Sequence, residues 1–143
     1  MVHVKVYEAP AGRGIMANLD HGADLLASIR RVAEENDVRA GVFWIIGAVR
    51  RAAIGYYDQG ERRYVEASLD EPLEIASCMG NIAQYKGETL VHAHITLAGR
   101  DGRAFGGHLY EGTIIYAAEL YLVELDLELE REYDETTGLN LFK

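Results

Sequence analysis

Three histidines flank a predicted tight turn, and this arrangement constrains the fold more than any other feature of the sequence. An apolar run lies on each side of Asp101-Gly102, a pair that is a strong signature of a two-stranded β-hairpin. His92 and His94 are two residues apart in the first run, so a strand places both imidazoles on one face. His108 lies in the second run. The segment therefore predicts a sheet whose hairpin carries three imidazoles.

The length of the turn decides whether the third histidine joins the other two. A two-residue turn at Asp101-Gly102 would place His108 opposite Ile95, on the face away from His94. A three-residue turn over positions 100–102, with a left-handed glycine, would place His108 directly across from His94. A bulge at the two glycines before His108 would have the same effect. The histidine cluster thus makes a specific demand on the backbone.

Such a cluster favours a metal site. Neutral imidazole is a common ligand of divalent transition metals, so we predict that His92, His94 and His108 converge on one ion. Nitrogen ligands favour zinc, nickel, copper or iron over calcium or magnesium, and zinc is our first choice. Glu119 is an acid in a strongly apolar run, which makes it the candidate for a further ligand or for a partner of one. Alternatively, the histidines are hydrogen-bonded inside the sheet or at a subunit contact.

Hydrophobic periodicity predicts the other elements. Residues 21–35 have apolar side chains at helical spacing, with Asp20 as the expected N-cap and Asn36 as the stop. We expect Arg50-Arg51 in a loop. The predicted strands are 2–7, 14–19, 38–49, 52–57, 62–67, 73–78, 113–122 and the alternating segment 123–130, in addition to the histidine hairpin.

Composition limits the class of protein. The 143 residues predict one domain spanning 1–143. A formal net charge of −9 disfavours a general phosphate-binding surface and hence DNA as a partner. Cys78 is the only cysteine, so no intrachain disulfide can form, which fits a cytoplasmic location. No apolar run is long enough to span a membrane, and the N-terminus has no signal-peptide pattern.

The order of short motifs resembles one known family over nearly the whole chain. The strongest match is His92-Ala93-His94 together with Gly106-Gly107-His108-Leu109. The other matching segments are Gly22-Ala23-Asp24-Leu25-Leu26, Gly47-Ala48-Val49, Gly55-Tyr56-Tyr57-Asp58, Leu73-Glu74-Ile75-Ala76-Ser77, Gly80-Asn81-Ile82, Ala118-Glu119 and Tyr133-Asp134-Glu135-Thr136-Thr137-Gly138. These residues are similar to the plants and prokaryotes conserved (PPC) domain in its short prokaryotic form.

The resemblance implies an α/β (α+β) fold, with a mostly antiparallel sheet of about seven strands and few helices, assembled as a homotrimer. It also associates the three histidines with the prokaryotic form. In plants the domain is fused to AT-hook motifs and acts in nuclear DNA-associated complexes, and prokaryotic relatives are often labelled DNA-binding. Here Gly12-Arg13-Gly14 lacks the flanking prolines and further arginines of such a hook.

Three hypotheses of function follow. The first is a metal-binding homotrimer with an open coordination position, suited to hydrolytic or lyase-type chemistry. The second is a DNA-associated or transcription-related module, which predicts a basic patch around Arg13, Arg30-Arg31 and Arg50-Arg51. The third is an assembly domain whose histidines pack at a subunit contact. The sequence names no substrate and leaves open whether the protein is an enzyme.

Overall fold

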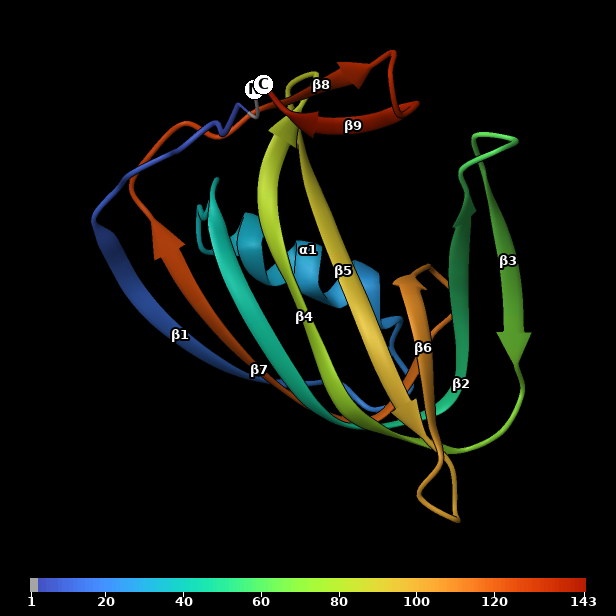
Figure 1. Cartoon of the computed structure of the whole chain (residues 1–143). Coiled ribbons are helices and arrows are strands. Elements are labelled where there is room, and N and C mark those ends of the chain that lie inside the picture. Colours follow the sequence, from blue (N-terminus) through green and yellow to red (C-terminus); the bar gives the residue numbers. More distant parts are fainter. Residues whose placement is uncertain (1–2) are drawn as a thin grey trace.

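A computed structural model describes residues 3–143 and confirms the predicted fold class, with 61% of the chain in strands (Figure 1). Its sheet has seven strands, packed against one helix. In chain order the elements are β1 (Ala11–Leu19), α1 (Leu25–Glu35), β2 (Gly41–Asp58), β3 (Arg63–Leu69), β4 (Leu73–Tyr85), β5 (Glu88–Ala98), β6 (Ala104–Leu109), β7 (Ile114–Leu125), β8 (Arg131–Asp134) and β9 (Leu139–Phe142).

The strands of the main sheet are antiparallel and lie in the order β1-β7-β2-β4-β5-β6. The long strand β2 pairs with β4 and β7 through its first half, and with β3 and β6 through its second half. Its pairing is irregular between Ile45 and Arg51, and within this stretch Gly47 has a φ of +149° and an added Cβ there would lie 2.1 Å from the carbonyl oxygen of Ala117. Glycine at this position therefore allows β7 to approach β2 closely. Beyond this stretch β2 pairs with β6, with Gly55 opposite His108.

Helix α1 covers one face of the sheet (Figure 1). Leu25, Ile29 and Ala33 are fully buried against the strands, as their helical spacing predicts. The predicted stop at Asn36 is confirmed, but the predicted N-cap at Asp20 is wrong. The cap is Asp24, whose carboxylate accepts hydrogen bonds from the backbone N–H groups of Ala27 (2.9 Å) and Gly112 (2.7 Å). These contacts tie the helix start to the loop before β7, a partner that the local sequence does not reveal.

Several strand boundaries also differ from the prediction. Position 2 of the expected first strand lies outside the described residues, and residues 3–7 form no strand because no other strand pairs with them. The first strand is instead β1, which begins at Ala11 and contains the whole of the expected second strand, residues 14–19. Arg50-Arg51 lies within β2 rather than in a loop. Strand β7 ends at Leu125. The alternating residues that follow form no further strand of the main sheet; Leu129 packs in a small second core and Glu130 makes a single bridge to Gln84 of β4.

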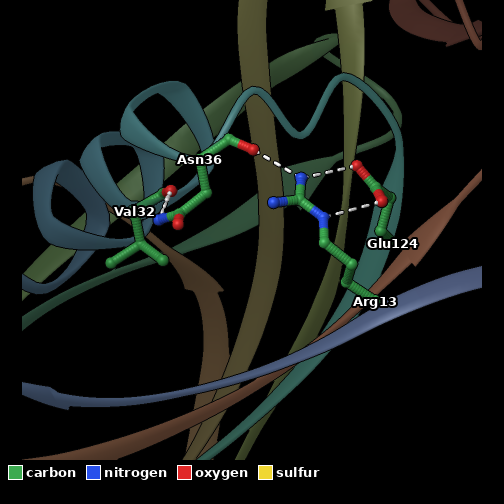
Figure 2. A network of polar contacts seen from close by, with 4 residues as sticks. All are labelled: Arg13, Val32, Asn36 and Glu124. Atoms are coloured by element: carbon green, nitrogen blue, oxygen red, sulfur yellow. Dashed lines mark hydrogen bonds and ion pairs between the residues drawn. The ribbon is translucent and has the colours of Figure 1, made fainter.

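An ion pair closes the edge of the sheet over the end of the helix (Figure 2). Arg13 of β1 donates through Nη2 to Glu124 of β7 (2.9 Å) and to the carbonyl oxygen of Asn36 (2.5 Å). Its Nε donates to the other oxygen of Glu124 at 3.1 Å. Arg13 is thereby occupied in joining β1, β7 and the C-terminal end of α1.

The C-terminal hairpin β8–β9 lies across the end of β4 and the start of β5 (Figure 1). Gln84 of β4 donates its backbone N–H to the carbonyl oxygen of Leu129 at 2.8 Å, just before β8. On the other side, the hydroxyl of Tyr57 donates to the carbonyl oxygen of Thr137 in the β8–β9 turn at 2.6 Å. The hairpin therefore spans from β4 to the β2–β3 hairpin, above the start of the histidine strand.

Within residues 3–143, α1 is too short to cross a membrane.

Candidate metal centre

The β5–β6 turn has the length that the histidine cluster requires. The carbonyl oxygen of Gly99 accepts a hydrogen bond from the N–H of Gly102, and the N–H of Gly99 donates to the carbonyl oxygen of Arg103, both with an N–O distance of 3.0 Å. The loop therefore comprises residues 100–102. Gly102 is left-handed, with φ of +83°. His94 consequently pairs directly with His108, which confirms the predicted register.

The two glycines before His108 do not form the bulge that was the alternative to a three-residue turn. Strands β5 and β6 pair without a register shift from Ala98 to His94, so no bulge is needed to place His108 on the same face as His92 and His94. Instead, a Cβ at Gly106 would lie 2.0 Å from the carbonyl oxygen of Ile95, and a Cβ at Gly107 would lie 2.5 Å from that of Gly55. These glycines allow β6 to fit closely between β5 and β2.

The three imidazoles form a compact group. The ring centroid of His92 lies 5.2 Å from those of both His94 and His108, and the last two are 5.8 Å apart. One ring nitrogen from each histidine can be chosen so that all three lie within 4.8 Å of one another. Tetrahedral zinc with Zn–N bonds of 2.0–2.1 Å would hold its nitrogens about 3.3 Å apart, so small side-chain rotations would suffice.

Two of the histidines are half-buried and held in the neutral form. The pKa of His92 is lowered to about 4, first by burial and then by the positive charge of Arg131 and by His94. Burial, followed by the other two histidines, lowers the pKa of His108 to about 4 as well. At neutral pH both rings therefore have a free lone pair. The Nδ1 atom of His108 is buried and has no hydrogen-bond partner among residues 3–143.

Two tyrosines enclose His108. Its ring centroid is 4.7 Å from that of Tyr64 and 4.9 Å from that of Tyr110. Tyr110 can lie this close because its ring packs over Gly55, where an added Cβ would approach within 2.3 Å. Burial raises the pKa of Tyr110 to about 12 and also raises the pKa of Tyr64, so both phenols are protonated at neutral pH. Tyr110 was not among the residues expected at the site, and Tyr64 also pairs with Tyr57 across β2 and β3.

A buried cation that the sequence analysis missed lies beside the cluster. Arg131 of β8 is 9% exposed. It donates to the side-chain oxygen of Asn81 (2.7 Å) and to the carbonyl oxygen of Asn140 (2.8 Å), and its guanidinium lies 4.3 Å from the centre of the Phe142 ring. The sequence feature that could have pointed to Arg131 is its position as the only basic residue among seven acidic residues between positions 124 and 135.

A cavity of about 320 Å³ joins these groups. Its wall includes His92, His108, Tyr64, Tyr110 and Arg131, and it is covered by residues 138–141 of the C-terminal hairpin. A larger cavity of about 550 Å³ lies near Arg50 and Arg100 but is lined by none of the histidines. The smaller cavity is the candidate site, because imidazoles, phenols and a buried guanidinium converge on it.

Within a single chain Glu119 lies far from the histidines, so its predicted role as a further metal ligand or as a partner of a ligand is wrong. Glu119 lies on β7, opposite Ile46 of β2 and Asn18 of β1, and it is exposed. Strands β2 and β4 lie between β7 and the histidine strand β5. Three strand spacings of about 4.8 Å each separate the two strands, which is too far for a carboxylate to reach an ion at the cluster.

We expect the metal-free protein to lose stability as the pH falls from about 6.5 to about 4. In this range the unfolded chain protonates His92 and His108, while the folded protein keeps them neutral because their pKa values are lowered from 6.5 to about 4. The thermal unfolding midpoint of chelator-treated protein should therefore fall across this range. A His92→Asn/His108→Asn variant should show a shallower fall, whereas the exposed control His3→Asn should behave like the original protein. Equal slopes in all three proteins would contradict this account.

Comparison with known proteins places this geometry in a family. The family model described as the Plants and Prokaryotes Conserved (PCC) domain matches residues 6–126. A metal-containing protein from Archaeoglobus fulgidus is 42% identical, with 98% of this chain and 99% of that chain covered and a TM-score of 0.93. A plant- and prokaryote-conserved (PPC) protein from Pyrococcus horikoshii is 29% identical, with 98% and 97% covered and a TM-score of 0.92.

Two other relatives carry different names. A protein from Ralstonia eutropha JMP134 with a provisional DNA-binding name is 26% identical, with 90% of this chain and 89% of that chain covered and a TM-score of 0.80. The bifunctional protein GlmU of Synechococcus sp. strain JA-3-3Ab is 33% identical over 120 residues, which is 82% of this chain but only 18% of the GlmU chain.

The family match covers all strands of the main sheet and all three histidines of the cluster. The chain belongs to the Plants and Prokaryotes Conserved domain family, abbreviated PCC or PPC.

Proposed function

We propose that this protein binds one divalent transition metal ion per chain, with zinc as the first candidate, through His92, His94 and His108. The observation that carries the proposal is the convergence of three imidazole nitrogens within 4.8 Å on adjacent strands. The buried Nδ1 of His108 fits this role, because coordination to an ion would satisfy an otherwise unpartnered lone pair. The name of the Archaeoglobus protein, which is 42% identical, supports metal binding in a close relative.

The proposed centre is of the open type. Three protein nitrogens leave a fourth position of a tetrahedral ion for water or a ligand, as in catalytic zinc sites. A zinc-bound water has a lowered pKa and can act in hydrolytic or lyase-type chemistry. The neutral state of His92 and His108 means that metal binding near pH 7 displaces no proton from these two rings.

Replacing the three ligands should abolish metal binding. We expect tag-free protein to contain about one zinc ion per chain and His92→Ala/His94→Ala/His108→Ala protein to contain only background metal. X-ray absorption should report nitrogen neighbours at about 2.0–2.1 Å. His21→Ala is the matched control, because His21 lies elsewhere and its Nδ1 is within hydrogen-bonding distance of the carbonyl oxygen of Tyr116. Equal metal content in the triple variant and the control would reject the site.

We further propose that the chain forms a homotrimer. On the sheet face opposite α1, a continuous row of paired residues runs across five strands. Its members are Met16, Tyr121, Trp44, Met79 and His94. Met16 of β1 is 69% exposed, and Ile46 of β2, two residues from Trp44, is 58% exposed, which is unusual for large apolar side chains on one sheet face. Burial between subunits would remove this surface from water, and the number three comes from the family resemblance.

Light scattering should therefore report about three times the chain mass of 15.9 kDa. Ile46→Glu places a charge in the apolar surface and should shift the protein towards monomer, since burying an unpaired carboxylate is costly. Tyr133→Glu is the control, because Tyr133 is also exposed but lies on β8. A monomeric original protein would contradict the proposal.

DNA binding is the second candidate function, favoured by the provisional name of the Ralstonia relative. The arginines expected to form a basic patch are partly occupied. Arg13 is paired with Glu124 and Arg31 with Glu35, and the formal net charge is −9. Arg30, Arg50 and Arg51 take part in none of the ion pairs within residues 3–143, so it is mainly the net negative charge that opposes phosphate binding.

We therefore expect no tight binding of duplex DNA at about 0.15 M salt. Fluorescence anisotropy with a labelled duplex should give a Kd in or above the non-specific range of roughly 10⁻⁴ to 10⁻⁶ M. The measurement should be repeated at lower salt, where any arginine–phosphate contacts would strengthen. Binding tighter than about 1 µM at the higher salt would favour the DNA function instead.

A further inference from the structure

Arg131 is a buried cation without a counterion in the part of the chain that the structure describes. It is 9% exposed, and it takes part in none of the ion pairs formed by residues 3–143. Its two hydrogen-bond acceptors, Asn81 and Asn140, are both neutral. Its Nε is buried and has no partner among those residues. A buried charge is costly unless an opposite charge compensates it, so this guanidinium is suited to an anion that the protein itself does not supply.

The position of Arg131 relative to the histidines is fixed by the sheet. Asn81 of β4 is directly opposite His92 of β5, and its side-chain oxygen accepts the hydrogen bond from Arg131 Nη2. Arg131, His92 and His108 all line the cavity of about 320 Å³. A molecule in this cavity can therefore contact the guanidinium and lie beside the histidine cluster at the same time.

The cavity also has the size and lining of a small-molecule site. Its volume is at the lower end of the usual range for ligand pockets, roughly 300–1,000 Å³. Tyr64 and Tyr110 supply phenol groups, while Leu90 and Leu139 supply apolar wall. Such a lining suits a short carbon skeleton that carries an acidic group.

We propose that this cavity binds a small carboxylate, with the carboxylate paired to Arg131 and the bound molecule extending to the open position of the metal. The planar guanidinium matches a planar carboxylate in geometry. The contact with the metal rests on the function proposed above, whereas the contact with Arg131 does not. Zinc bound by three neutral imidazoles would add positive charge to the cavity and strengthen the attraction for an anion.

The C-terminal hairpin supplies the residue that selects for charge. Arg131 lies in β8, beyond the family match over residues 6–126, and residues 138–141 of the same hairpin line the cavity. The histidines therefore belong to the shared sheet, and the anion contact belongs to the segment that follows it.

Acetate is the simplest probe, and it can be titrated into zinc-loaded protein while ¹⁵N–¹H NMR spectra are recorded. We expect the Nε–H resonance of Arg131 and the amide resonances of residues 138–141 to shift with one Kd. Arg131→Gln should retain its zinc but bind acetate at least tenfold more weakly, since a hydrogen bond to a charged group is lost. Arg31→Gln on α1 is the control, because Arg31 is exposed and paired with Glu35, and it should leave the acetate Kd unchanged.

The outcomes separate this inference from the proposed function. Zinc-loaded protein in which acetate moves neither Arg131 Nε–H nor the hairpin amides would overturn the carboxylate site while leaving the metal centre intact. A response to inorganic phosphate without one to acetate would overturn it too. A protein that binds no zinc but whose Arg131 resonance shifts with acetate would reject the metal centre and retain the anion contact. Because the Nε–H measurement uses the original protein, it decides the question even if Arg131→Gln does not fold.

Discussion

The antiparallel pairing of β5 with β6 is the constraint on which the candidate site depends. Side chains alternate between the two faces of a strand, so a one-residue slip would turn His108 away from His92 and His94. The left-handed conformation of Gly102 sets the three-residue turn, and the turn sets the register. A single backbone conformation at a loop thus determines whether three imidazoles meet.

Closure of the sheet adds the second wall of the site. After an irregular stretch between Ile45 and Arg51, the second half of β2 pairs with β6, which brings the β2–β3 hairpin and its Tyr64 beside His108. Contacts with Gln84 and Tyr57 then hold the C-terminal hairpin over the same region. The cavity is consequently built from segments that are far apart in the sequence, although the histidines come from two consecutive strands. Burial in this enclosure keeps His92 and His108 neutral, because a protonated, charged imidazole would lose its hydration there.

Expectations based on local pattern were confirmed where neighbours in the sequence are also neighbours in space. The hairpin of β5 and β6 and the buried stripe of α1 are of this kind. Expectations failed where a distant partner decides the outcome. Asp24 rather than Asp20 caps the helix, and its carboxylate also accepts a hydrogen bond from the N–H of Gly112, far along the chain. Residues 3–7 alternate like a strand but have no strand beside them with which to pair.

The sequence by itself determined the strand-rich fold class, the common face of His92 and His94, and the alternatives for His108, because side-chain period and turn chemistry are local properties. Only the tertiary structure decided the order of strands, and strand order decides which charges lie near the histidines. It placed Glu119 three strands away and brought Arg131 to the cavity from a separate hairpin. Neither position follows from residue spacing, because strand pairing between distant segments is selected by the packing of the whole core.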